Sequence, residues 1–364
     1  MLILNVLSEA LLYLCFSLLL GSFIINLVPE NYRPEIKVSK AVILGAVLGI
    51  ALFSFVPVLR IILYLSEGGL GISSTLQSVL TNFESGKSWI KTGILSIILF
   101  IFLLPIKVER KPYLSITGLI LTLALIGTIG LSSHASSLSK WPGFFTHTTH
   151  FLAVSTWIGV LMMVSWFSKN HDNWLKFLTW YTPLAAICFL ITIITGISLM
   201  TFVMDVKDYA NTWPLSYGQA LLVKHLTIVP LLVFAFINSV LVRKKMASDS
   251  TFNPLSWAKL ESVIVLLLFA VTGALGQQSP PHDIFITLKT EGVSSLFSFF
   301  HSSKVVFPLH VTLGIGSVSL LLIAIFFLIL TIIIFVKRAQ KSLTILMSVL
   351  FIFTAYVAMM LSIK

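Results

Sequence analysis

Residues 307–336 read FPLHVTLGIGSVSLLLIAIFFLILTIIIFV, a stretch without Asp, Glu, Lys or Arg. A helix needs roughly 20 apolar residues to cross a hydrocarbon core of about 30 Å, so this stretch predicts a transmembrane helix. The whole 364-residue chain has the same character, because 57% of its residues are hydrophobic, 10% are charged and its mean hydropathy is +1.02. Soluble domains carry about 25% charged residues. The composition therefore indicates a protein embedded in a lipid bilayer.

Nine further apolar stretches accompany this one. They are too long and too apolar for barrel strands, and a helix satisfies its own backbone hydrogen bonds inside lipid. We therefore predict an all-α polytopic bundle of about ten spanning helices, with an eight-helix core ending near 276 and two additional C-terminal helices from 307. A more polar stretch, 70–87, is expected to form a loop or an interfacial segment. The predicted spans are 4–28, 40–63, 89–106, 113–132, 144–168, 177–203, 216–242, 257–276, 307–336 and 342–361.

The net charge of +11 is explained by membrane topology. The densest basic clusters, around 107–111, 243–245 and 337–341, fall on one side when the spans are threaded in order. Basic loops stay in the cytoplasm, so both termini are expected outside. The basic excess then predicts a bilayer partner and no nucleic acid.

The histidines are distributed asymmetrically under this topology. Of the eight, only His171 is cytoplasmic, and the others lie in outer loops or outer parts of helices. His147 and His150, in HTTHFLAVSTW (147–157), are at i and i+3 and share a helix face, which Trp157 continues inward. His134, in SSHASS (132–137), is joined to them by a short linker. Imidazoles suit copper and related metals, so the pattern predicts a metal site near the outer face; interfacial histidines bonded to loops are the alternative.

A second group of candidates lies in SYGQALLVKH (216–225). Lys224 places a charge inside a span, at a cost of roughly 2.5–3.5 kcal/mol on insertion scales. It either extends outward to water or pairs with Glu9 or Asp205, where it would set the electrostatics of a pore. His225 is a further candidate metal ligand.

Two methionines and one carboxylate complete the candidates. Met200 and Met204 are at i and i+4 near the outer end of the sixth span, and thioethers select Cu(I), although Met also fills gaps in cores. Glu261 lies near the cytoplasmic end of the eighth span. It is either a cytoplasmic release station or part of a local ion pair with Lys259.

Several enzyme signatures are missing from the sequence. It contains no Gly-rich phosphate loop, nucleophile elbow, HExxH helix or CxxCH heme-attachment motif. We therefore expect a protein that is not an enzyme and not an ATP-driven pump.

Four motifs in order carry a family resemblance. SSHASS, then HTTHFLAVSTWIGVLM (147–162), then SYGQALLVKH, then WAKLESVIVLLLFAVTGAL (257–275) followed by QQSPP resembles the CopD family of bacterial copper membrane proteins. The resemblance covers roughly 1–281 and is strongest from 130. It implies an eight-helix copper-handling domain over 1–281 in the bacterial plasma (inner) membrane. An outer loop, 282–306, in which 293–300 is expected to lie on the membrane surface, and the two helices of 307–364 fall outside it.

The resemblance also implies roles for particular residues. His134, His150, Trp157, Lys224 and Glu261 match family positions. Ser133 and Val160 stand where the family commonly has Gly, and His147 and His225 have no family counterpart. The family often works with a CopC domain; no CopC-like β-sandwich sequence is present here, so a CopC-like extracellular copper donor would be a separate protein.

These observations favour a protein that moves copper ions across the membrane; inward movement is the expected direction, with Cu(I) preferred over Cu(II). Two alternatives stay open. One is a membrane redox protein that holds heme b between histidines of separate helices, such as His150 with His225 or His310. The other is a non-transporting factor that delivers copper to a partner.

Overall fold

A computed structural model describes the chain except residues 1, 68–70, 106–110, 250, 302–304 and 364. Its described residues form helices and no β-strand, which confirms the all-α prediction. Ten of these helices are long and apolar enough to cross a membrane. Each falls within or close to one predicted stretch. The spans are Ile3–Leu27, Lys40–Ser66, Glu84–Leu103, Pro112–Leu131, Lys140–Phe167, Trp174–Thr201, Ser216–Ser248, Leu255–Gly276, Ile315–Val336 and Leu343–Met360.

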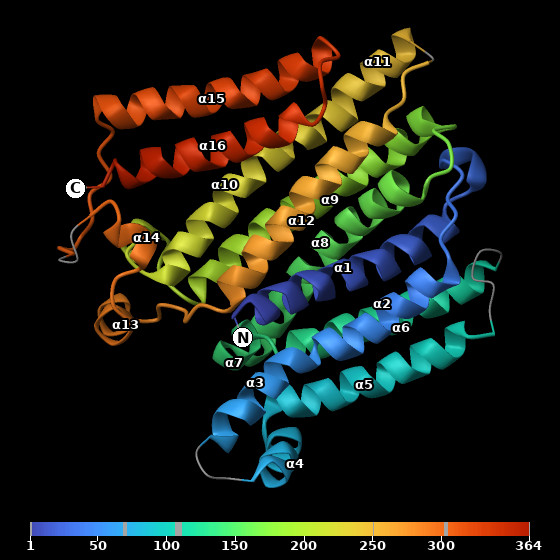
Figure 1. The fold of residues 1–364 in the computed structure, drawn as a ribbon. Coiled ribbons are helices and arrows are strands. Elements are labelled where there is room, and N and C mark those ends of the chain that lie inside the picture. Colours follow the sequence, from blue (N-terminus) through green and yellow to red (C-terminus); the bar gives the residue numbers. More distant parts are fainter. Residues whose placement is uncertain (1, 68–70, 106–110, 250, 302–304, 364) are drawn as a thin grey trace. The chain divides into compact units, whose positions relative to one another are not determined.

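The chain forms two compact units, Met1–Phe202 and Val203–Lys364. The first unit contains nine α-helices and one 3-10 turn in its described part, coloured blue to green in Figure 1. Their bounds are α1 Leu2–Leu27, η1 Glu30–Tyr32, α2 Lys40–Phe53, α3 Phe55–Ser66, α4 Ile72–Asn82, α5 Glu84–Leu103, α6 Pro112–Leu131, α7 His134–Leu138, α8 Lys140–Phe167 and α9 Trp174–Thr201.

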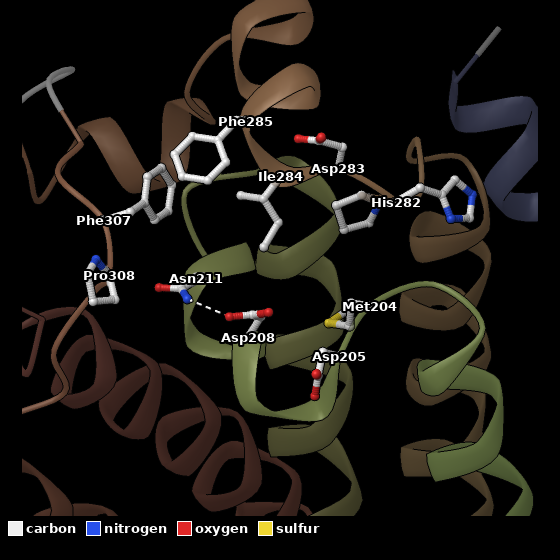
Figure 2. A pocket seen from close by; sticks show the side chains of 11 residues that line it. Met204, Asp205, Asp208, Asn211, His282, Asp283, Ile284, Phe285, Phe307 and Pro308 are labelled. Atoms are coloured by element: carbon white, nitrogen blue, oxygen red, sulfur yellow. Dashed lines mark hydrogen bonds between the residues drawn. The ribbon is translucent and has the colours of Figure 1, made fainter.

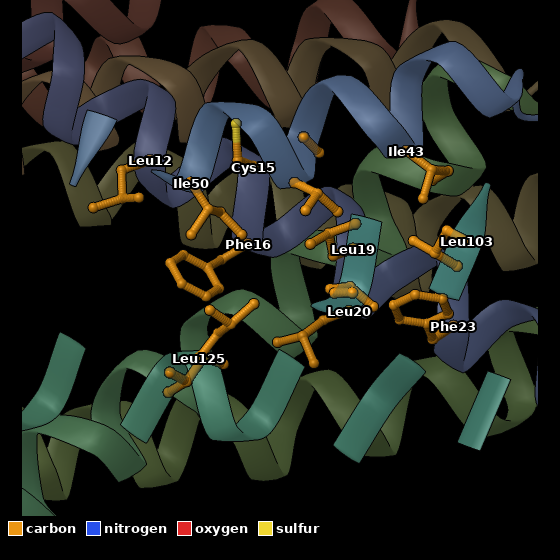
Figure 3. Close-up of a cluster of buried hydrophobic side chains, with 14 of the residues drawn as sticks. Leu12, Cys15, Phe16, Leu19, Leu20, Phe23, Ile43, Ile50, Leu103 and Leu125 are labelled. Carbon is orange, nitrogen blue, oxygen red and sulfur yellow. The ribbon is translucent and has the colours of Figure 1, made fainter. Parts of the chain in front are cut away.

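Helix α1 is the centre of the first unit. It packs against α2, α6 and α8. Its side chains Phe16, Leu19 and Phe23 are fully buried in one apolar cluster with residues of α2, α5 and α6, as Figure 3 shows. Phe16 also meets Phe151 of α8 edge-on, with ring centroids 5.1 Å apart. Helix α8 is therefore held firmly along one face.

Two glycines allow α1 and α8 to cross closely. A Cβ atom built on Gly21 would lie 2.1 Å from the carbonyl oxygen of Gly159, and one on Gly159 would lie 2.2 Å from the carbonyl oxygen of Ser17. Small residues permit such backbone approach between membrane helices. The crossing fixes the depth of α8 against α1, and with it the depth of the histidines on α8.

The polar stretch 70–87 forms more regular structure than expected. It contains α4 and the start of α5. Val79 of α4 is fully buried against Val58 and Ile62 of α3. Hydropathy missed this helix because only a narrow face is buried, whereas most of its side chains are exposed.

The second unit contains the yellow-to-red helices of Figure 1. One of them is interrupted: α10 passes through a π-helical segment, η5, into α11. The bounds are η3 Val206–Asp208, η4 Ala210–Thr212, α10 Ser216–Phe236, η5 Ile237–Leu241, α11 Val242–Ser248, α12 Leu255–Gly276, α13 Ile284–Glu291, α14 Ser295–Ser298, α15 Ile315–Val336 and α16 Leu343–Met360.

The two C-terminal helices belong to the packing of this unit. Helices α15 and α16 run side by side (Figure 1), and both contact α10. Tyr356 of α16 donates a hydrogen bond to the amide oxygen of Gln219 on α10, and the Gln219 amide donates to the Trp213 carbonyl at 2.6 Å. The ninth span, predicted over 307–336, begins later than expected, because α15 starts at Ile315 and His310 lies before it.

Two loops meet at one end of the second unit. The backbone N–H of Leu309 donates to the side-chain oxygen of Asn211 at 2.8 Å, and the N–H of Ser294 donates to the carbonyl of Pro214 at 2.8 Å. Residues 203–215 and the described parts of 277–314, which are 277–301 and 305–314, therefore form one packed end. At the other end of the unit, Arg338 forms an ion pair with Asp249.

Candidate functional site

His134 is the first residue of the short helix α7. Its side chain is exposed, and Ser133 caps the helix by accepting a hydrogen bond from the N–H of Ser136 at 3.2 Å. Helix α7 packs tightly on the start of α8, since a Cβ atom on Gly143 would lie 1.9 Å from the Ala135 carbonyl oxygen. His150 is seven residues beyond Gly143, about 10.5 Å further along the helix axis. His134 thus lies at the rim of α8, and His150 lies two turns deeper.

His147 and His150 are both half-buried on α8, which begins at Lys140 and not at 144 as predicted. The Nδ1 atom of His150 lies 2.9 Å from the hydroxyl oxygen of Thr195 on α9. The Thr195 hydroxyl donates its proton to the Ile191 carbonyl at 2.6 Å, so it accepts from His150. His150 therefore carries its proton on Nδ1 and its lone pair on Nε2, the tautomer in which Nε2 can bind a metal.

Two other candidates of the first unit are held by local contacts. Trp157 is 5% exposed, its carbonyl accepts a hydrogen bond from the Tyr181 hydroxyl at 3.3 Å, and its ring meets Phe189. This places it in the packing between α8 and α9. Glu9 on α1 accepts a hydrogen bond from Tyr13 at 3.1 Å.

The two methionines do not lie on one helix, although their i, i+4 spacing near the end of the sixth span suggested a common site. Helix α9 ends at Thr201, so Met200 is inside it and Met204 is in the following loop, in the second unit. The chain leaves the helix here because Asp205 caps the next turn, η3, through the N–H of Lys207. Met200 is half-buried and Met204 is 7% exposed.

Lys224 and His225 lie on α10, in the second unit. Asp205, one of the two acids suggested as partners for Lys224, forms its ion pair with Lys207 at 2.9 Å. His225 Nδ1 lies 2.8 Å from the hydroxyl of Tyr209. Burial raises the pKa of Tyr209 to about 12, so its hydroxyl keeps its proton and remains a neutral partner for the imidazole.

Glu261 is a carboxylate buried inside a spanning helix. It is 3% exposed, and its Oε2 accepts a hydrogen bond from the Asn238 amide at 2.7 Å. The same amide donates to the Trp257 carbonyl at 3.1 Å. Asn238 lies in the π-helical segment η5, and such segments occur frequently at functional sites.

The structure thus brings together only some of the predicted residues. His147 and His150 share α8, with His134 at its rim, in the first unit. Met204, Lys224, His225 and Glu261 all belong to the second unit, but Glu261 is at a different level of the helices from His225. Across the residues that the structure describes, no group of three or more His, Cys, Asp or Glu side chains is arranged to hold one metal ion.

Sequence reasoning missed the partners of these residues. Thr195 and Asn238 are polar residues within apolar spans, which is a usable signal, since such residues tend to bond across helices. The residue that each one contacts could not be inferred, because Thr195 is 45 positions from His150 and Asn238 is 23 from Glu261.

Comparisons with known proteins agree with the predicted family. Residues 175–275 match the CopD family, described as Copper resistance protein D. The chain is 27% identical over 338 residues to the copper transport protein CutJ of Bacillus subtilis (strain 168). This alignment covers 84% of the chain, and the chain spans 60% of the length of that relative. No solved structure matches.

Proposed function

We propose that this chain, which matches the CopD family over residues 175–275, moves copper ions inward across the plasma membrane of a bacterium, through a histidine site near the outer face. His150 carries the proposal. It lies within a spanning helix, matches a family position and is held by Thr195 in the tautomer that a metal ligand needs. The name of CutJ, a copper transport protein, supports the same cargo.

The proposed copper site comprises His150, His147 one turn away and His134 at the rim of α8. His147 lies one turn from His150 on the same face of α8, and α7 is packed on the start of α8. A side-chain rotation of His134 or His147 is needed to complete a shared coordination sphere, since the three rings are not arranged around one point.

We favour Cu(I) as the transported form, because thioether ligands select this soft ion and the chain offers two of them, Met200 and Met204, four positions apart. An inside-negative potential favours inward movement of a cation by about 2.3 kcal/mol per charge per 100 mV. Lys224 and Glu261 are proposed to set the electrostatics of the path, and a separate CopC-like protein is the proposed outer donor.

Copper binding and copper uptake by histidine variants test this proposal. Purified wild type in lipid nanodiscs is expected to bind copper, and His150→Ala and His134→Ala are each expected to lose about one bound ion per chain and most of the uptake in reconstituted vesicles. His171→Ala is the matched control, because His171 is on the predicted cytoplasmic side, and it should behave as wild type.

Three results would overturn the proposal. Unchanged copper binding in His150→Ala would show that His150 is not part of a copper site. Binding without uptake would favour a delivery factor. A Soret band with stoichiometric heme in the purified protein would favour the redox alternative.

A further inference from the structure

A cavity of about 440 Å³ opens at one end of the second unit, between the loop before α10 and the loop after α12. It lies outside the histidine site, since none of His134, His147 and His150 lines it. Figure 2 shows its walls: Met204, Asp205 and Asp208 come from the first loop, and Asp283, Phe285 and Phe307 come from the second. We refer to this cavity, defined by these six residues, as the acidic vestibule.

Negative charge is concentrated in the acidic vestibule. Among the described residues, its lining includes three aspartates and no Lys or Arg, although the full chain has 24 Lys and Arg against 13 Asp and Glu. Lys207 pairs with Asp205 at 2.9 Å and offsets one of these charges, so Asp208 and Asp283 supply the net negative charge. Hydrogen bonds from Lys207 lower the pKa of Asp205, so that carboxylate is ionised at neutral pH. A cleft lined by one sign of charge concentrates ions of the opposite sign. The acidic vestibule should therefore attract cations.

The aspartates keep acceptor capacity for a ligand. Asp208 uses its Oδ1 to accept from the Asn211 amide at 2.9 Å, and Asp283 uses its Oδ1 to accept from the N–H of Ile286 at 2.9 Å. An ionised carboxylate offers about four lone-pair positions on two oxygens. Both side chains can thus bind a cation while they continue to hold their loops in place.

Met204 adds a soft donor to this charged wall. Met204 is only 7% exposed, yet it lines the cavity. Figure 2 shows its sulfur on the side of Asp208. Across the cavity, the rings of Phe285 and Phe307 meet edge-on with centroids 5.0 Å apart. Apolar walls of this kind strengthen the field of the carboxylates. Oxygen and thioether ligands side by side suit copper ions better than they suit magnesium or calcium.

The geometry of the acidic vestibule indicates weak, reversible binding of a cation and not a permanent metal site. No three His, Cys, Asp or Glu side chains of the described chain are placed to coordinate one ion, and the ring of His282 is turned away from the carboxylates in Figure 2. The cavity is large enough for an ion with its water shell, since each water takes about 30 Å³. A cation would be held by charge and one or two direct ligands, and it could leave again.

We propose that the acidic vestibule is a second copper-binding site, which collects partly hydrated copper ions at the outer face before they enter the membrane. This inference rests on the proposed function for the identity of the ion and on the predicted topology for the side. The carboxylates attract the ion, and Met204 gives preference to its soft form.

Charge-removing variants that preserve hydrogen bonding test the acidic vestibule. In Asp205→Asn/Asp208→Asn/Asp283→Asn, the Asn oxygens can still accept the capping hydrogen bonds. In vesicles at low ionic strength, the copper concentration for half-maximal uptake is expected to rise about tenfold, at the lower end of the range for electrostatic focusing, with the maximal rate unchanged. The difference should shrink in 1 M salt, where the screening length is about 3 Å.

The control is Glu291→Gln, which neutralises an exposed acid at the end of α13 outside the cavity. The copper concentration for half-maximal uptake should be the same in this variant as in wild type. Met204→Leu keeps the volume and removes the sulfur, so it should weaken equilibrium binding of Ag(I), a stable stand-in for Cu(I), more than binding of Cu(II). Asp208→Asn alone should weaken binding of Cu(II) more than binding of Ag(I). Both single variants still test the acidic vestibule if the triple variant does not fold.

The outcomes separate this inference from the proposed function. If wild type takes up copper and the aspartate and methionine variants match it in half-saturation and binding, the acidic vestibule is not a copper site, and transport stands. If wild type takes up no copper, transport is wrong. In that case, equilibrium binding of Cu(II) and Ag(I) to the same variants in nanodiscs still decides the acidic vestibule: weaker binding supports it and unchanged binding overturns it.

Discussion

At the scale of single residues, His150 shows what sequence can predict and what it cannot. Its place on a helix beside His147 follows from i, i+3 spacing and was confirmed, since both lie on α8. Its chemistry depends on Thr195 of α9, whose hydroxyl fixes the imidazole tautomer. No local pattern contains that contact. The pairings of His225 with Tyr209 and of Glu261 with Asn238 were hidden for the same reason.

We predict that Thr195→Val weakens copper binding about 10–100-fold, the usual effect of losing a partner that orients a metal-binding histidine. Valine keeps the shape and removes the acceptor for the Nδ1 proton. Isothermal titration of the protein in nanodiscs measures the change. Thr192→Val is the matched control, because the Thr192 hydroxyl donates to the Cys188 carbonyl of its own helix at 2.8 Å. Equal copper affinity in the two variants would show that Thr195 does not orient the site.

At the scale of elements, hydropathy predicted where the spanning helices lie but not where they end or how closely they pack. Met204 was expected near the end of the sixth span, but that helix stops at Thr201. The stretch that contains α4 was expected as a loop or an interfacial segment, because the buried face of α4 is narrow. The contact between Gly21 of α1 and Gly159 of α8 depends on two backbones meeting 138 positions apart in the chain. Only the structure reveals which glycines are at a crossing and which have open space beside them.

The crossing gives the second prediction. In Gly159→Ala, the new methyl group would lie 2.2 Å from the backbone oxygen of Ser17, and a backbone cannot move aside as a side chain can. We expect the variant to lose about 1–3 kcal/mol of unfolding free energy, the usual cost of overpacking, and to bind copper less well because α8 shifts. Denaturation in one detergent measures the loss.

Gly127→Ala is the control for this prediction. Gly127 is on α6, and a Cβ atom there meets nothing within 4 Å. Alanine favours a helix over glycine by about 1 kcal/mol, so this variant should be as stable as wild type or more stable. A Gly159→Ala variant as stable as Gly127→Ala would mean that α1 and α8 do not cross at these residues.

At the scale of the whole molecule, the number of spans could be predicted because apolar length is a local property of the sequence. The division into Met1–Phe202 and Val203–Lys364 could not, because it depends on which helices share buried faces. Sequence reasoning separated the last two helices from an eight-helix core, whereas α15 and α16 pack on α10 in the second unit. The orientation of the protein in the membrane is a further property of the whole molecule, and the charges of the loops determine it.

The charges of the second unit predict its orientation. Arg243, Lys244 and Lys245 of α11 lie at one end with Arg338 and Lys341, and the acidic vestibule lies at the other. Positive loops remain cytoplasmic, so Lys289 of α13 should face outward and Lys341 inward. Both lysine side chains are exposed. The two native cysteines are buried, and replacing them by alanine gives a cysteine-free background for labelling with a membrane-impermeant maleimide.

In that background, Lys289→Cys should react in intact cells, and Lys341→Cys should react only after the membrane is permeabilised. The two variants control for each other, because each removes one lysine from an exposed position of the same unit. The reverse pattern would place the basic end outside and the acidic vestibule in the cytoplasm. The vestibule would then have to release copper instead of collecting it, and inward transport would lose its proposed point of capture.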